Sequence, residues 1–197
     1  GAAILRRSPA PAGSPYVPNP QATGTGGINA SNVRKRDDTV PVKHRRFNVT
    51  IMAFKHTDFV SDKLRRNKEW DGDAVSRFCS YFKQLGSRGS FVDARAGIGT
   101  YALPVASCMR GRGGRVVAIE DRPQVAGNLR WGMKYNDLDN VRLYQYELGA
   151  HTAGESAWSK EWHKKMPVTT LDAILGAEGI GPQRVFGMRL DLEGQEA

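Results

Sequence analysis

The sequence predicts an α/β fold in which a doubly wound, mainly parallel sheet is covered by helices. Within residues 90–148, three short apolar segments of strand character alternate with two helical segments. Consecutive parallel strands are joined by right-handed helical crossovers, so this order of elements predicts a parallel sheet. The chain has 197 residues, of which 40% are hydrophobic, and this is enough for one folded domain with a tail.

Two elements are expected upstream of this region. Residues 47–54, FNVTIMAF, alternate loosely between apolar and polar side chains and are rich in strand formers, so they predict a strand. Residues 58–82 contain Phe78, Tyr81 and Phe82 at helical spacing, which predicts an amphipathic helix with an aromatic, core-facing side. We expect Asp73 to cap this helix and Gly86 to end it.

The elements of the expected sheet follow one another closely. A strand at 90–94 leads through a glycine turn at 96–100 into an apolar helix at 101–109. The next helix begins with a proline, which the first helical turn tolerates. The further elements are a strand at 115–120, a helix at 123–135, a strand at 141–148, a short helix at 170–175 and a fourth strand at 184–192.

Positive charge is concentrated near the amino end. The chain has 29 Lys and Arg against 20 Asp and Glu, a net charge of +9, and most of this excess lies in the first 50 residues. Residues 1–46 are rich in Pro and Gly and predict an extended basic arm, with 47–197 as the folded domain. Such an arm suits other proteins of a large assembly, RNA or another acidic surface, and the alternative is a solvated or targeting tail.

The first 36 residues contain no acid, a feature of organellar transit peptides. We therefore expect a mitochondrial or plastid location, with the cytoplasm as the alternative. No apolar run approaches the roughly 18 residues that a membrane span requires, so no transmembrane segment is expected.

The cysteines and histidines show no metal-binding pattern. Cys79 and Cys108 lie in separate apolar stretches and form no Cys-x-x-Cys pair, so we expect two buried free thiols in a reducing compartment. Four histidines are scattered without the spacing of metal ligands, and no metal site is expected.

The glycine turn is the strongest indication of a binding site. Asp93, Gly97 and Gly99 follow the pattern Asp-x-x-x-Gly-x-Gly between a strand and a helix. Glycines there let the backbone approach a ligand, and Glu120 at the end of the next strand stands where a carboxylate binds ribose hydroxyls. These residues predict a nucleoside-containing ligand. The alternative is that the glycines serve packing alone and that Glu120 and Asp121 are exposed loop acids.

An ordered series of blocks resembles the S-adenosylmethionine-dependent methyltransferases of the FkbM type. The blocks are FVDARAGIGTYALPVAS, VVAIEDRPQVAGNLRWGMKYNDLDNVRLYQYELG, VTTLDAIL and MRLDLEGQEA, and the resemblance covers roughly residues 47–197. It implies a Rossmann-like methyltransferase fold and S-adenosylmethionine as cofactor. It also implies that Asp93, Gly97 and Gly99 form the cofactor turn, that Glu120 holds the ribose, and that residues 146–148 lie near the adenine.

The last block resembles the family's Asp-x-Glu-Gly motif at the carboxyl end of the fourth strand. Asp191, Glu193 and Gly194 occupy the motif positions. Asp191 or Glu193 is the expected catalytic residue, which would orient or deprotonate a substrate hydroxyl. Glu193 could instead cap the following helix.

The chain departs from the family pattern in two places. Arg95 stands where the family has a glycine, and its side chain is expected to obstruct the methionine part of the cofactor. The alternative is that Arg95 pairs with the cofactor carboxylate. The family's sheet also continues past the Asp-x-Glu-Gly block, so the expected fold is incomplete at its carboxyl-terminal end, and a partner could cover that flank.

The sequence therefore supports three functional hypotheses. The first is a methyltransferase that acts on a hydroxyl or another heteroatom. The second is a non-catalytic methyltransferase-fold subunit, or pseudoenzyme, that the basic arm anchors in a large organellar complex. The third is nucleic-acid binding through the arm, which would weaken steeply with salt and show little sequence preference.

Overall fold

The computed structural model describes residues 38–56, 58–85, 89–150, 158–159, 164–165 and 168–191. Four strands form one sheet, and every neighbouring pair in it is parallel. In spatial order these strands are β10 (Val185–Leu190), β3 (Ser90–Ala94), β4 (Arg115–Ile119) and β5 (Val141–Tyr144). Most of the expected arm, residues 1–37, lies outside the described residues.

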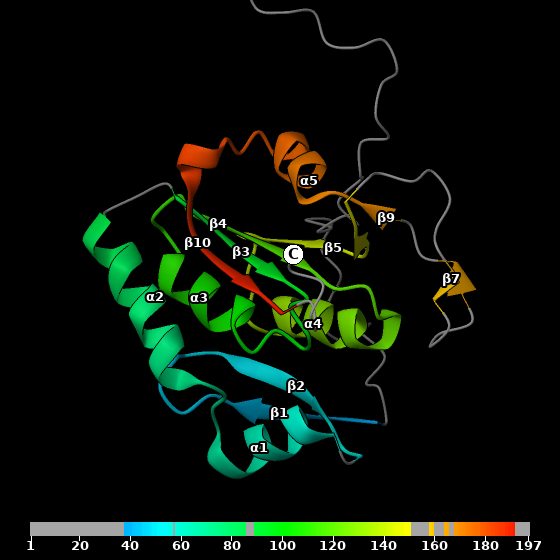
Figure 1. Cartoon of the computed structure of the whole chain (residues 1–197). Coiled ribbons are helices and arrows are strands. Elements are labelled where there is room, and N and C mark those ends of the chain that lie inside the picture. The colour runs from blue at the N-terminus through cyan, green and yellow to red at the C-terminus, as the bar shows by residue number, and fades with distance from the viewer. Residues whose placement is uncertain are drawn as a thin grey trace, which may run out of the picture.

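Helices cover both faces of this sheet (Figure 1). Helix α3 (Ala102–Met109), helix α4 (Pro123–Tyr135) and helix α2 (Gly72–Leu85) lie on one side, and helix α5 (Leu171–Ala177) lies on the other. Side chains of a strand alternate between faces, so Phe91 and Val116 join the core under α3, whereas Val92 and Val117 join the core under α5. The predicted fold class, a doubly wound, Rossmann-like α/β fold with a parallel sheet, is confirmed.

A β-hairpin precedes the sheet in the sequence, and only its second strand was predicted. Strand β1 (Thr39–Lys43) pairs antiparallel with β2 (Thr50–Phe54), so folded structure begins upstream of the boundary expected at residue 47. Pro41 sits in the middle of β1 and argues against a strand in the sequence. The strand tolerates it because, among the described residues, β1 pairs with β2 alone, so its other edge needs no backbone donor.

The hairpin is docked on α4 by side-chain amides. Asn136 accepts a hydrogen bond from the Thr50 amide at 2.6 Å and donates one to the Thr50 carbonyl at 2.7 Å. Asn128, which is fully buried, donates to the Met52 carbonyl at 3.2 Å. These bonds satisfy polar groups of β2 that the hairpin leaves unpaired, and they hold β2 against the layer that covers the sheet.

The helix predicted between Asp73 and Gly86 is present as α2, but a separate helix that was not predicted precedes it. Helix α1 (Phe59–Asn67) begins after Asp58, whose carboxylate accepts hydrogen bonds from the Val60 and Ser61 amides at 3.1 and 3.2 Å. Lys68 and Asp71 have positive φ angles of 60° and 45°, and these left-handed residues separate α1 from α2. Asp73 is therefore in the first turn of α2 rather than a cap, and Gly86 lies outside the described residues.

The remaining elements agree with the prediction apart from their ends. Strand β5 stops at Tyr144, and residues 147–148 belong to a separate two-stranded pair, β6 (Glu147–Leu148) with β9 (Val168–Thr169). The Thr170 hydroxyl accepts from the Ala173 amide at 3.1 Å, so Thr170 caps α5 rather than opening it. A second small pair joins β7 (Trp158–Ser159) to β8 (Lys164–Lys165), and a 3₁₀ turn, η2 (Pro182–Arg184), precedes β10.

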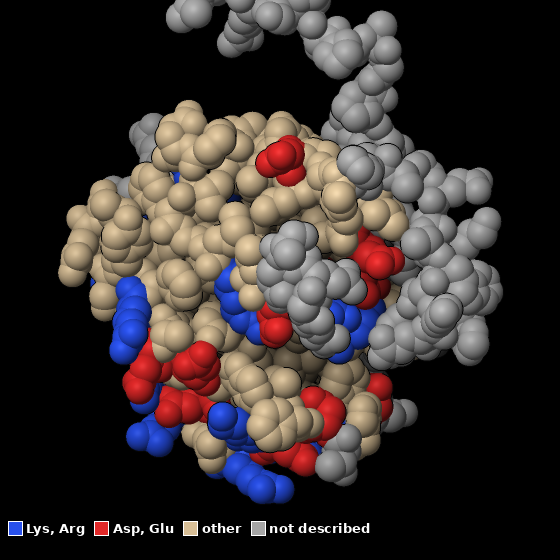
Figure 2. All heavy atoms as spheres, in the orientation of Figure 1, with Lys and Arg blue, Asp and Glu red and all other residues tan. Residues whose placement is uncertain are grey.

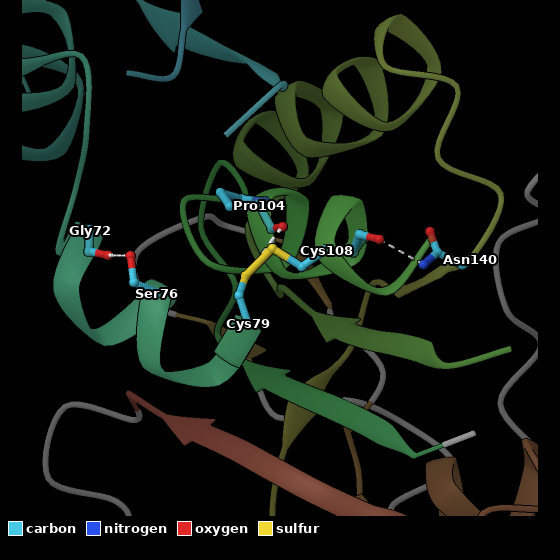
Figure 3. The surroundings of a disulfide bond; sticks show 7 residues. Gly72, Ser76, Cys79, Pro104, Cys108 and Asn140 are labelled. Atoms are coloured by element: carbon cyan, nitrogen blue, oxygen red, sulfur yellow. Dashed lines mark hydrogen bonds between the residues drawn. A yellow bond between two sulfur atoms is a disulfide. The ribbon is translucent and has the colours of Figure 1, made fainter. Parts of the chain in front are cut away.

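The prediction of two free thiols is wrong, because Cys79 and Cys108 form a disulfide (Figure 3). Cys79 lies in α2 and Cys108 in α3, and their Cα atoms are 5.6 Å apart. The two helices pack side by side, which a sequence separation of 29 residues does not reveal. The inference of a reducing compartment rested on free thiols and loses its support.

Two further properties concern the described residues. None of the helices formed by them is long and apolar enough to cross a membrane. Among the same residues, no three His, Cys, Asp or Glu side chains gather where they could hold a metal ion.

Candidate functional site

The glycine turn after β3 folds over the end of β4. The Ala96 amide donates a hydrogen bond to the Ile119 carbonyl at 2.8 Å, and the Gly97 amide donates to the Glu120 carboxylate at 2.8 Å. The structure thus brings the turn and Glu120 together at the carboxyl edge of the sheet, where ligands bind in open α/β sheets.

The two glycines of the turn have different roles. Gly97 has a φ of 61°, and a Cβ added there would meet no atom within 4 Å. Gly99 has a φ of 92°, and a Cβ there would lie 2.5 Å from Leu129 Cδ1 and 2.8 Å from Leu103 Cγ. Gly97 therefore leaves open space beside the backbone, whereas Gly99 permits the close packing of α3 and α4.

A cavity of about 470 Å³ lies beside Gly97. One wall comes from the turn and the strand ends, a second from the first residues of α4, and a third from the segment that runs from β2 to the start of α2. Charged side chains of both signs surround the centre of the face shown in Figure 2. The residues that line the cavity are Asp38, Phe54, His56, Asp58, Val60, Trp70, Arg95, Ala96, Gly97, Ile98, Thr100, Arg122, Gln124, Val125, Arg189 and Asp191.

Glu120 is fully buried behind the cavity wall. Its carboxylate accepts hydrogen bonds from the Gly97 amide at 2.8 Å, the Arg122 amide at 3.1 Å and the Arg122 Nε at 2.7 Å. Arg122 itself lines the cavity, whereas Glu120 does not. Ribose hydroxyls could reach the Glu120 carboxylate only after the Arg122 guanidinium moves aside.

Asp93 is held inside the sheet rather than in the cavity wall. It is fully buried, and Arg189, its register partner on β10, donates to its Oδ1 at 3.0 Å. Burial raises the pKa of Asp93 to about 6, although the Arg189 guanidinium opposes this rise. Asp93 therefore positions Arg189 in this structure and presents no group to the cavity.

Asp191 lies at the cavity, directly after β10. Its carboxylate accepts a hydrogen bond from Arg189 Nη2 at 2.5 Å, and its side chain is 56% exposed. The Asp191 amide donates to the Ala94 carbonyl at 3.3 Å, which fixes the backbone against the end of β3. Glu193 and Gly194, the other motif residues, lie outside the described residues.

Arg95 follows β3 and forms part of the cavity wall. Its φ of 65° is a conformation that favours glycine, which explains why a glycine suits this position. Its Nε lies 3.7 Å from an Asp121 carboxylate oxygen, and its side chain is largely buried. Obstruction of the cofactor by the Arg95 side chain stays a prediction.

The network that supports Arg189 was not predicted from the sequence. The Tyr101 hydroxyl donates to the Asp71 carboxylate, and the Arg189 guanidinium lies 4.7 Å from the centre of the Tyr101 ring. Burial and the hydrogen bond to Asp71 raise the pKa of Tyr101 above its ordinary value. Asp71, Tyr101 and Arg189 come from three segments that are remote in sequence, so only the fold brings them together.

Residues 146–148 do not line the cavity. Tyr146 is 6% exposed and packs with Tyr144 in the core under α5, with ring centres 6.4 Å apart. Glu147 and Leu148 form β6. The expected position of this segment beside an adenine therefore stays a prediction.

Comparison with known proteins finds similarity to methyltransferases. No family model matches the chain, so the FkbM resemblance also stays a prediction. The chain is 26% identical over 115 residues to the 23S rRNA (uracil(1939)-C(5))-methyltransferase RlmD of Psychromonas ingrahamii, which covers 58% of this chain and 24% of that protein. The chain thus spans about a quarter of the length of this relative.

Two solved structures illustrate the structural likeness. The SAM-dependent methyltransferase from Agrobacterium tumefaciens is 11% identical, with a TM-score of 0.43 over 59% of this chain and 34% of that one. TYW2 of M. jannaschii, in complex with AdoMet, is 15% identical, with a TM-score of 0.39 over 62% of this chain and 55% of that one.

Proposed function

We propose that this chain is the cofactor-binding part of an S-adenosylmethionine-dependent methyltransferase that acts on RNA. The observation that carries the proposal is the cavity at the carboxyl ends of β3 and β4, where Gly97 leaves open space and its amide meets the carboxylate of Glu120. RNA as the acceptor is supported by the relative RlmD, whose name gives 23S rRNA as its substrate. The FkbM-like blocks support the same cofactor with a hydroxyl acceptor instead.

The cavity suits an adenosyl ligand in size and lining. Its volume of about 470 Å³ falls within the range of small-molecule sites, roughly 300–1,000 Å³. Ile98 and Val125 offer apolar contacts for a base, and Glu120 would hold the ribose once Arg122 moves. Arg95 would pair with the carboxylate of the methionine part. When bound, S-adenosylmethionine supplies a methyl group that a nucleophile on the acceptor can attack.

Asp191 is the residue best placed to orient the acceptor. One of its carboxylate oxygens is bound by Arg189, and the half-exposed side chain faces the cavity. Arg189 is itself fixed by Asp93 and by the Tyr101 ring, so the Asp191 carboxylate is held in one orientation. A carboxylate held in this way can accept a hydrogen bond from a hydroxyl or amine and aim that group for attack.

A second function, a non-catalytic subunit, is favoured by one contact and one residue of the turn. Arg122 covers Glu120, and Arg95 stands in the turn where the family has glycine. In this alternative the closed site no longer takes cofactor, and the basic residues 1–46 anchor the fold in a large organellar assembly. RNA or another acidic surface is then a partner of these residues rather than a substrate.

Calorimetric titration of the whole chain with S-adenosylmethionine tests the proposal. We expect binding by the unchanged chain and a loss of tenfold or more in Glu120→Gln, because a hydrogen bond to a charged group is worth about 1.5–3 kcal/mol. Arg112→Ala, an exposed substitution in the loop after α3, serves as the control and should bind normally.

The outcome separates the two functions. Absence of heat in the unchanged chain together with clear heat in Arg122→Ala would favour the non-catalytic subunit. Absence of heat in every variant, with folding intact by circular dichroism, would refute the cofactor-binding proposal. Where S-adenosylmethionine binding is measurable, Arg95→Gly decides the role of the Arg95 side chain. Tighter cofactor binding by this variant indicates obstruction by Arg95, and weaker binding indicates pairing with the cofactor carboxylate.

A further inference from the structure

Aromatic rings form part of the cavity wall. Phe54, His56 and Trp70 line the cavity; Phe54 is the last residue of β2, and His56 and Trp70 lie between β2 and α2. The Phe54 and His56 rings are in contact, with centres 4.7 Å apart. Phe59 meets Trp70 edge to face at 5.7 Å and is 76% exposed, so it extends the aromatic surface out of the cavity. We call these four residues the aromatic rim.

Basic side chains adjoin this rim. Lys63 Nζ lies 4.8 Å from the centre of the Trp70 ring, one helical turn beyond Phe59 on α1. Lys55 and Arg66 are exposed on the same segment. Arg65, by contrast, is paired with Asp62 and with the Phe54 carbonyl. The rim therefore combines flat apolar rings with cations that can meet phosphate oxygens.

We propose that the aromatic rim binds an unpaired RNA base by stacking, with Lys63 and Arg66 contacting the adjoining phosphates. This proposal rests on the proposed function, because it assigns the acceptor to the same cavity. The exposed Phe59 ring is the stacking platform, and Trp70 supports it edge to face, with the two ring planes 89° apart. Trp70 also lines the cavity, and so does Asp191. An unstacked base that enters from the platform therefore approaches the carboxylate that would orient it.

The chemistry of the rim favours a single-stranded segment over other partners. Bases inside a duplex hide their faces in the helix stack, whereas an unpaired base offers a face to an aromatic ring. A docking helix would need an apolar groove, but Phe59 is the only exposed large apolar side chain of α1, and its turn-related neighbour Lys63 is charged. Rings beside cations match the combination of base and phosphate in one nucleotide.

Fluorescence anisotropy with a labelled single-stranded RNA 15-mer of mixed sequence tests the platform. The whole chain should bind the single strand more tightly than the same strand annealed to its complement. Phe59→Ala and Trp70→Ala should each weaken binding by roughly five- to a hundredfold, the usual effect of losing one stacked base. Tyr81→Ala and Tyr135→Ala, which remove exposed aromatic rings from α2 and the end of α4, should leave the affinity unchanged.

Two further measurements protect the test against trivial explanations. Trp70→Phe keeps a ring and should restore most of the affinity that Trp70→Ala loses. Lys63→Gln should reduce the slope of log affinity against log salt by about 0.7, the value expected for one phosphate contact to a single strand. Apart from this salt titration, all variants are compared at one fixed salt concentration, so that binding by the basic residues near the amino end is the same in all of them.

Calorimetry with S-adenosylmethionine on the same variants separates this proposal from the proposed function. Phe59 does not line the cavity, so Phe59→Ala should bind S-adenosylmethionine normally while it loses RNA affinity. RNA affinity unchanged in both Phe59→Ala and Trp70→Ala would overturn the platform and leave cofactor binding intact. RNA binding that depends on the platform in a chain that binds no S-adenosylmethionine would support the platform and refute the proposed function. If the unchanged chain associates with itself and Phe59→Ala abolishes this while RNA affinity stays unchanged, the rim is a protein contact and the proposal is overturned.

Discussion

The two glycines of the turn allow packing and ligand access to be tested separately. Gly99→Ala places a Cβ 2.5 Å from Leu129 Cδ1 and 2.8 Å from Leu103 Cγ, at a φ of 92°. Gly97→Ala adds the same atom at a φ of 61° with no neighbour within 4 Å. Both variants incur the cost of a left-handed residue, roughly 1–2 kcal/mol, and Gly99→Ala alone incurs overpacking of about 1–3 kcal/mol.

We therefore expect urea unfolding to give a free energy about 1–3 kcal/mol lower for Gly99→Ala than for Gly97→Ala. In cofactor titrations the order should reverse, because the Cβ of Gly97→Ala projects into the space beside the cavity. Equal stabilities of the two variants would refute the assignment of Gly99 to helix packing. Equal cofactor affinities would refute the assignment of Gly97 to the ligand.

Three further predictions concern the framework of the cavity. The pKa of Asp93 rises from 3.8 to about 6 on folding, so protonated Asp93 contributes up to about 3 kcal/mol to the free energy of unfolding below about pH 4. This contribution is lost as the pH rises through 6. Urea unfolding of Asp93→Asn should lack this decline in stability, and a parallel decline in the variant would contradict the prediction. Cys108→Ser should lower the free energy of unfolding by about 3–4 kcal/mol, the loop-closure value for a separation of 29 residues. A melting temperature of the unchanged chain that stays the same under reducing conditions would show that the disulfide contributes nothing to stability. Asn136→Ala leaves polar groups of Thr50 without their partner and should cost about 1–3 kcal/mol, whereas amide exchange in β2 as slow as in the unchanged chain would exclude a docking role.

Local patterns were sufficient to predict the central strands and the turn. The segment from Ser90 to Tyr135 consists of adjacent elements, each with its own apolar periodicity and its own breaking residue. The meeting of Gly97 with Glu120 followed from the same order, because neighbouring parallel strands end at one edge. The Arg122 contact could also have been found, since it lies only two residues from Glu120.

Contacts that depend on remote segments could not be predicted. Arg189 pairs with Asp93 across 96 residues, and nothing in either segment specifies their register. The disulfide depends in the same way on the packing of α2 against α3. The break between α1 and α2 was missed because Lys68 and Asp71 adopt left-handed conformations that glycine usually marks in a sequence.

The docking of the hairpin on α4 has a thermodynamic consequence for anything that enters the cavity. Phe54 of β2 and Val125 of α4 both line that space, so an occupant touches the hairpin and the helical layer at once. By mass action, a bound ligand then shifts the equilibrium between the docked and the undocked hairpin toward the docked state. The logarithm of the hydrogen–deuterium exchange rate at the Thr50 amide, which bonds to Asn136, would therefore fall in proportion to the logarithm of ligand concentration, so this amide reports how much of the protein has ligand bound.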